Sequence, residues 1–114
     1  MVTPAIGAVV LVPFPFSDLS RSKLRPAIVL ADAGRDDWVL CQVTSNPYGD
    51  ARAIVLSDHN LREGKLHRKS YVRPGRLFTA NRDLITRQVG VLKAEALQAI
   101  IAAVVELLQG GLET

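Results

Sequence analysis

Three basic residues, Arg21, Lys23 and Arg25, lie close together where a polar loop meets an apolar strand. The surrounding sequence, VVLVPFPFSDLSRSKLRPAIVL, predicts two apolar strands that flank the loop of residues 17–24. Pro26 favours an extended conformation for the residue before it, so the Arg25 side chain can leave the sheet at the start of the second strand. A guanidinium held on a strand beneath a basic loop is a candidate phosphate site. The alternative is an edge-strand arginine paired with a neighbouring carboxylate.

Two hydroxyl side chains, Thr44 and Ser45, end another predicted strand, residues 39–45, where we expect them to be held at one side and open to solvent at the other. Beside Arg25, such hydroxyls could hold a scissile phosphodiester and stabilise the extra negative charge of a five-coordinate transition state. RNA supplies its own nucleophile, the 2'-hydroxyl, so this chemistry needs positioning and charge stabilisation more than a metal. The alternative role of these hydroxyls is a hydrogen bond within the turn that follows.

Other chemistries find little support in the sequence. His59 and His67 stand eight apart without a ligand-spaced partner, so we predict no metal site. Cys41 shares a strand face with Val39 and Val43, which predicts a buried thiol and not a nucleophile. Nucleophile elbows and glycine-rich phosphate loops are absent, and we expect no cofactor.

The composition indicates one domain, residues 1–114, with 48% hydrophobic residues to build a core. A net charge of +3 favours a polyanionic partner. A single cysteine favours a reducing, cytoplasmic location over secretion. Prolines and glycine interrupt the apolar N-terminal run, so we predict neither a signal peptide nor a membrane span there.

Short apolar or alternating runs predict strands at residues 9–12, 39–45, 53–56, 70–72, 77–79 and 85–91, besides the strand that begins at Arg25. We expect a turn at Pro74-Gly75 and an exposed polar excursion at residues 57–69. Apolar residues spaced three and one apart predict a helix over residues 93–109, ended by Gly110-Gly111. The order of elements predicts a mainly β fold with a C-terminal α-helix, a small antiparallel barrel or sheet closed on one side by that helix.

Four blocks carry a resemblance over nearly the whole chain: VVLVPFPFSDLSRSKLRPAIVL, QVTSN, SYVRPGRLFT and ITRQVGVLKAEALQAI. In this order and spacing they resemble the PemK/MazF family of toxins from type II toxin-antitoxin systems. The resemblance implies an SH3-like antiparallel barrel of the PemK/MazF/CcdB type with a C-terminal helix. It also implies a homodimeric endoribonuclease that cleaves single-stranded RNA at short sequences without metal and is blocked by a cognate antitoxin. A two-fold pairing would also cover the sheet face that a single helix leaves open.

By this resemblance, Arg25 matches the family's catalytic arginine, a general acid or transition-state clamp, and Thr44 matches its catalytic threonine, a phosphate donor. The loop of residues 17–24 matches the segment that covers bound RNA. We accordingly expect six residues to bind substrate: Ser17, Ser20, Arg21, Lys23, Ser45 and Arg73. Some members place an aspartate two residues after the arginine that Arg73 matches, but this chain has Gly75 there. No residue is assigned as the general base.

Base specificity is expected from aromatic side chains that stack unpaired bases, with Phe14, Phe16 and Tyr48 as candidates. Two other functions stay open. One is a toxin of the same fold that binds DNA gyrase without catalysis, although that group relies on an aromatic C-terminal tail and residues 110–114 contain no aromatic. The other is a catalytically silent RNA-binding relative.

Overall fold

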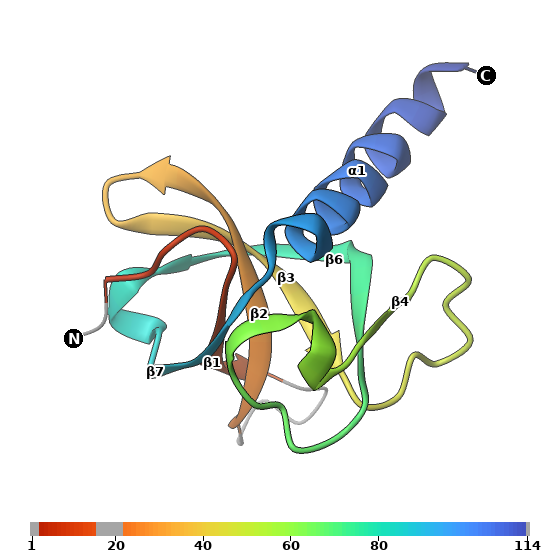
Figure 1. The fold of residues 1–114 in the computed structure, drawn as a ribbon. Coiled ribbons are helices and arrows are strands. Elements are labelled where there is room, and N and C mark those ends of the chain that lie inside the picture. Colours follow the sequence, from red (N-terminus) through yellow and green to blue (C-terminus); the bar gives the residue numbers. More distant parts are fainter. Residues whose placement is uncertain (1–2, 16–21, 114) are drawn as a thin grey trace.

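The computed structural model of the protein describes residues 3–15 and 22–113. Within them, seven strands form one curled antiparallel sheet in the order β4-β6-β3-β2-β1-β7-β5, and helix α1 lies against one side of it (Figure 1). The strands are β1 Ala8–Pro15, β2 Ser22–Gly34, β3 Asp37–Thr44, β4 Ile54–Leu56, β5 Leu61–Gly64, β6 Ser70–Asn81 and β7 Arg87–Leu92, and α1 is Ala94–Gly110. Three short 3-10 helices are η1 Asp58–Asn60, η2 Arg82–Leu84 and η3 Gly111–Glu113. The predicted fold class, a small, mainly β antiparallel barrel with a C-terminal α-helix, is confirmed, and the sheet curls into a half-barrel.

The core has two layers, one on each face of the curled sheet. Neighbouring strand residues point to opposite faces, so Val9 belongs to one layer and Val10 to the other. The first layer packs under α1 and contains Val9, Ile28, Cys41, Val43, Leu56, Leu61, Val72, Leu92 and Ile100. The second layer contains Ala8, Val10, Val12, Ala27, Val29, Leu40, Ala80 and Ile85. A one-residue slip of β1 or β2 would exchange the layers, so burial on both faces determines the register that positions the site.

The β2–β3 hairpin turns through Arg35 and Asp36, whose φ angles are 57° and 64°. A two-residue hairpin turn requires such left-handed conformations because they match the twist of the flanking strands. The hairpin arm extends from the body on the opposite side from α1 (Figure 1).

The predicted turn at Pro74-Gly75 is wrong, because β6 runs as one strand through these residues. Its pairing with β3 changes register there: Cys41 faces Leu77, but Val43 faces Val72. Four residues of β6 there stand against one residue of β3, Gln42, so the strand bulges and bends without ending (Figure 1). Pro74, which has no N–H to donate, is buried within this bulge.

Two other boundaries differ from the sequence prediction. Strand β2 begins at Ser22 and not at Arg25, since the residues before Arg25 already pair with β1. The segment of residues 57–69 is not wholly an exposed excursion, because Leu61 on β5 is buried beside Leu92 of β7. Its other residues are mostly exposed.

Helix α1 lies within one residue of its predicted bounds, and Lys93 at its N-cap makes no side-chain capping bond. Ile100 and Val104 bury its inner face, and its C-terminal half projects away from the sheet (Figure 1). In the part of the chain described, no helix combines the length and the apolar character needed to cross a membrane.

Candidate nucleic-acid interface

Arg25 and Thr44 come from adjacent strands and meet at the same end of the sheet. The β2–β3 register pairs Ala27 with Gln42. Continuing this antiparallel register by two residues places Arg25 opposite Thr44, with both side chains on one face. The pairing itself starts at Ala27 and Gln42, so Arg25 and Thr44 lie just beyond its end. The two residues predicted to act together therefore lie side by side.

Both residues line a hollow of about 420 Å³, which we call the basic cleft. Its lining residues are Leu11, Lys23, Leu24, Arg25, Pro26, Val43, Thr44, Ser45, Lys65, Leu66, His67, Arg68, Ser70, Arg87 and Val89. Five of these are lysines or arginines, and none of the described lining residues is an aspartate or glutamate. Cations that converge without acidic neighbours in one hollow concentrate positive potential there, which favours a polyanionic ligand.

Pro26 occupies a place in β2 that tolerates the loss of a backbone donor. Residues before Ala27 pair with β1, whereas the pairing with β3 begins only at Ala27. Pro26 thus lies where β2 has a single ladder, as prolines in sheets do. Arg25, immediately before it, is half-buried and held by its pairing with Val12.

Thr44 is only 3% exposed, so the expectation that it opens to solvent is wrong. Its side chain lies under the strand end because β3 still pairs with β6 at this position, where Thr44 faces Tyr71. Thr44 Oγ1 accepts a hydrogen bond of 3.2 Å from the backbone N–H of Asn46, the turn interaction that was the alternative role. A hydroxyl that accepts one bond keeps its own proton to donate. Ser45, the next residue, is exposed.

The other predicted substrate residues are distributed as follows. Lys23 is exposed and lines the basic cleft with Ser45. Arg73 does not line it: its Nε lies 3.0 Å from Asp50 Oδ2, and its guanidinium lies 5.7 Å from the ring centre of Tyr48. Hydrogen bonds from Arg73 and from the backbone of Arg52 lower the pKa of Asp50, which keeps this pair ionic at neutral pH. Ser17, Ser20, Arg21 and the aromatic candidate Phe16 lie outside the described residues.

Four residues of the basic cleft were not expected from the sequence: Lys65, His67, Arg68 and Arg87. Three of them come from the connection between β5 and β6, which reads KLHRK. Such a dense basic cluster is a signal for a phosphate-binding segment, but it did not indicate which strands the segment would lie beside. His67 has a φ of 68°, a left-handed conformation uncommon outside glycine that is found more often at functional sites.

Cys41 behaves as the sequence predicted. It is fully buried, and burial raises its pKa to about 12. Its Sγ–H donates to the carbonyl of Arg73 at 3.1 Å. A thiol with this pKa stays protonated at neutral pH and is not a nucleophile. Among residues 3–15 and 22–113, no three His, Cys, Asp or Glu side chains gather as a metal site would require.

This curled sheet with its C-terminal helix has the fold of the MazF toxins. A MazE-MazF crystal structure from Deinococcus radiodurans is 23% identical, with 92% of this chain and 95% of that chain covered and a TM-score of 0.72. An endoribonuclease from Mycobacterial species is 17% identical, with coverage of 95% and 93% and a TM-score of 0.69. The Mycobacterium tuberculosis toxin MazF-mt6 is 19% identical, with coverage of 85% and 91% and a TM-score of 0.66. Identities this low show the fold alone.

The family is shown by the sequence. Residues 5–108 match the model of the PemK-like, MazF-like toxin of type II toxin-antitoxin system, and the chain belongs to this family. A search of curated proteins finds no match.

Proposed function

We propose that this protein is the toxin of a type II toxin-antitoxin pair and acts as a sequence-specific endoribonuclease on single-stranded RNA, without a metal ion. The observation that carries the proposal is the juxtaposition of Arg25 and Thr44 in a cleft lined by cations. Family membership and the fold shared with mycobacterial endoribonucleases support it.

In the proposed reaction the 2'-oxygen of the substrate forms a bond to the adjacent phosphorus, and the bond from phosphorus to the 5'-oxygen breaks. The 2'-hydroxyl loses a proton and the departing 5'-oxygen gains one, so the products are a 2',3'-cyclic phosphate and a 5'-hydroxyl. Arg25 and the Thr44 hydroxyl would donate hydrogen bonds to the non-bridging oxygens, whose negative charge increases in the five-coordinate state. Lys23, Lys65, Arg68 and Arg87 would hold the neighbouring phosphates.

The direct test is cleavage of a long single-stranded RNA by the purified protein in EDTA. We expect discrete fragments with 2',3'-cyclic phosphate ends, and binding that weakens steeply as salt rises because phosphate contacts release counterions. Well-folded protein that leaves a diverse RNA pool intact would contradict the enzymatic proposal. In that case the gyrase-binding toxin and the silent RNA-binding relative would be the functions to test.

His67 is the one histidine among the described lining residues of the cleft, and we propose that it carries a proton to or from the reacting oxygens. Imidazole exchanges protons near neutral pH, whereas arginine stays protonated and is a poor base. His67→Ala is expected to lower the single-turnover cleavage rate about 100-fold, at the lower end for general acid-base catalysis. His59→Ala is the matched control, because His59 is exposed on η1 and does not line the cleft.

An RNA that carries sulfur in place of the bridging 5'-oxygen distinguishes whether His67 acts as the general acid or as the general base. A thiolate leaves without protonation, so the defect of His67→Ala disappears on this substrate if the histidine is the acid and persists if it is the base. A rate within twofold of wild type on ordinary RNA would show that His67 carries no proton in the reaction.

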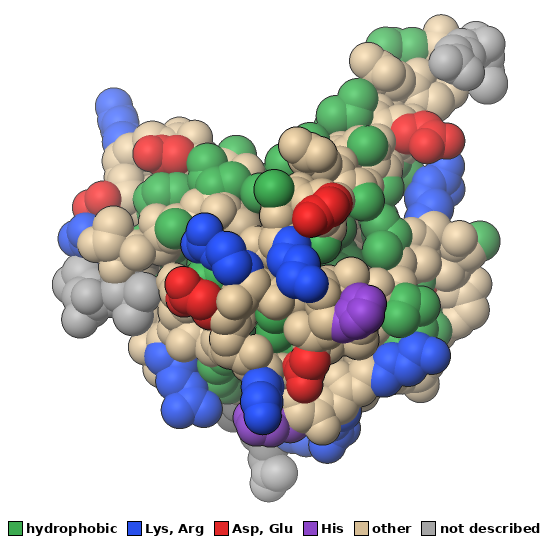
Figure 2. All heavy atoms as spheres, viewed as in Figure 1, with side chains coloured by type: hydrophobic (Ala, Val, Ile, Leu, Met, Phe, Trp, Pro, Cys, Tyr) green, Lys and Arg blue, Asp and Glu red, His purple; other side chains and the backbone are tan. Residues whose placement is uncertain are grey.

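Self-association is proposed from the surface of α1. Ile101, Val105 and Leu108, with Leu112 just beyond the helix, are exposed and recur at intervals of four, three and four residues. This spacing makes one apolar stripe beside the face that packs on the sheet. Hydrophobic side chains gather along the helix and on the surface between it and the β2–β3 hairpin (Figure 2). A homodimer would cover this surface, and the MazE-MazF structure supports an antitoxin as a further partner.

Replacing both Val105 and Leu108 with Glu is expected to weaken self-association at least about 100-fold, since each buried aliphatic side chain contributes about 1.5–3 kcal/mol. Sedimentation equilibrium measures the change. Ala102→Glu is the control, because Ala102 is exposed about 100° around the helix from Ile101. Equal dimer affinity in the double variant and the control would exclude α1 from the dimer interface.

A further inference from the structure

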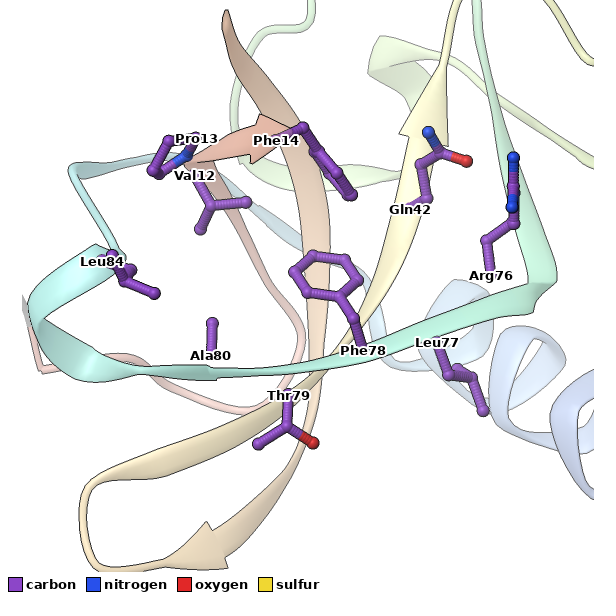
Figure 3. A pocket seen from close by; sticks show the side chains of 10 residues that line it. All are labelled: Val12, Pro13, Phe14, Gln42, Arg76, Leu77, Phe78, Thr79, Ala80 and Leu84. Carbon is purple, nitrogen blue, oxygen red and sulfur yellow. The ribbon is translucent and has the colours of Figure 1, made fainter. Parts of the chain in front are cut away.

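A second hollow, of about 620 Å³, opens on the sheet beside the basic cleft and is not explained by phosphate binding. We call it the apolar pocket. Its lining residues are Val12, Pro13, Phe14, Gln42, Arg76, Leu77, Phe78, Thr79, Ala80 and Leu84. Figure 3 shows Phe14, Phe78, Val12 and Leu84 around one space, while Leu77 and Thr79 point away from it.

The centre of the pocket is aromatic. Phe14 of β1 and Phe78 of β6 are both half-buried and meet edge to face, with ring centres 4.7 Å apart and an interplanar angle of 63°. In an edge-to-face pair, one face of a ring is not covered by the partner ring, so a third flat group can stack on it. Unpaired nucleobases stack on such faces.

One polar group stands out in this apolar lining. Gln42 Oε1 is buried, and no hydrogen-bond donor reaches it among the described residues. A buried acceptor without a donor is unfavourable, and this cost is relieved when the amide turns toward the pocket and accepts an N–H from a ligand. The side chain of Arg76, which is exposed, rises from β6 on the same side as Gln42 (Figure 3). The pocket thus combines an aromatic surface, an acceptor that lacks a donor and a cation at its mouth.

The pocket lies on the same face of the sheet as the Arg25–Thr44 pair, although the two hollows share no lining residue. Gln42 precedes Thr44 by two residues on β3, so the two side chains share a face and lie roughly 7 Å apart along the strand. Val12, on the floor of the pocket, faces Arg25 in the β1–β2 register. A nucleotide bound at the scissile phosphate would have its neighbour at the pocket.

We propose that the apolar pocket binds an unstacked nucleobase next to the scissile phosphate and determines the base preferred at that position. The base packs against Phe14 and Phe78, an N–H of its Watson–Crick edge donates to Gln42 Oε1, and Arg76 contacts a flanking phosphate. This inference rests on the proposed RNA substrate. A second protomer is the competing occupant, but an unpartnered amide oxygen and a cation suit a nucleotide better than an apolar protein surface.

The test compares wild type, Gln42→Leu and Gln88→Leu on a pool of randomised single-stranded RNA, with fragment ends identified by sequencing. Gln88 is the matched control because it is exposed on β7 and lines neither hollow. We expect Gln42→Leu to reduce the base preference at one position beside the cleaved bond about tenfold, and Gln88→Leu to leave it unchanged. Phe78→Leu should raise KM about tenfold with kcat little changed.

Cleavage by Gln42→Leu with wild-type preference at every position would overturn the inference while the proposed ribonuclease function stands. If the wild type does not cleave at all, the wild type and Gln42→Leu are compared by RNA binding instead. The same pool with 2'-O-methyl riboses resists cleavage, and the wild type should enrich a base that Gln42→Leu does not. Equal enrichment by both proteins would overturn the nucleobase pocket. If Gln42→Leu changes only the dimer affinity measured by sedimentation equilibrium, the surface belongs to a contact with a second copy of the chain.

Discussion

Arg25→Ala is expected to lower the single-turnover rate of RNA cleavage about 1,000-fold, the largest effect of any single substitution in the basic cleft. Of the arginines among the described lining residues of the cleft, Arg25 is the one on β2, next to the strand that carries Thr44, and its guanidinium can place two parallel N–H donors on a phosphate there. Removing one preorganised donor of this kind costs about 10²–10³ in rate, and Arg25 supplies more than one. The measurement uses saturating protein in EDTA, so that weaker binding does not obscure the chemical step.

Two further variants, Arg25→Lys and Arg87→Ala, test whether the rate loss is specific to the guanidinium at position 25. Lysine keeps the charge but not the planar fork, so we expect an intermediate loss of about 100-fold. Arg87 lies on β7 at the other side of the cleft, and its loss should raise KM and reduce the salt dependence of binding by about one phosphate contact. If Arg25→Ala and Arg87→Ala showed equal changes in both the cleavage rate and KM, Arg25 would be a binding residue without a special part in the transition state.

Thr44→Val is expected to lower the same rate about 300-fold, because valine keeps the shape of threonine and removes the hydroxyl donor. Thr44 is buried under the strand end, so a substitution that changed its volume would also disturb packing. The change additionally removes the acceptor of the Asn46 N–H bond, which should reduce the free energy of unfolding by about 1 kcal/mol. Denaturant titration separates this loss of stability from the loss of activity.

Thr44→Ser is the rescue variant, since it restores the hydroxyl without the methyl group. We expect its cleavage rate to lie within about tenfold of wild type, well above that of Thr44→Val. A Thr44→Val protein that is less stable but fully active would leave the hydroxyl with its turn hydrogen bond as its only role. The double variant Arg25→Ala/Thr44→Val should lose less transition-state stabilisation, in free energy, than the two single variants lose together. The reason is that both groups are proposed to act on one phosphate.

The strands and the helix could be predicted from the sequence because the signals that specify them are local. The alternation of residues 39–45 predicted β3 and the burial of Cys41, since side chains of a strand point to alternate faces whatever lies around it. The three-and-one spacing before Gly110 predicted α1 to within one residue. The resemblance of the RPAIVL and VTS motifs predicts one candidate site for Arg25 and Thr44, but it does not predict the strand order that brings both residues to the basic cleft.

The tertiary structure alone decided what surrounds that pair. The continuity of β6 through Pro74-Gly75 depends on its pairing with β3, because a bulge and a turn share the same local residues. The sequence predicts His67 only as part of an exposed segment, and the return of its connection past the ends of β2 and β3 brings it to the cleft. The same long-range packing turns Arg73 toward Asp50 and leaves Gln42 Oε1 without a donor among the described residues. Periodicity along a chain specifies which face a side chain occupies, but contacts between distant segments determine what that face meets.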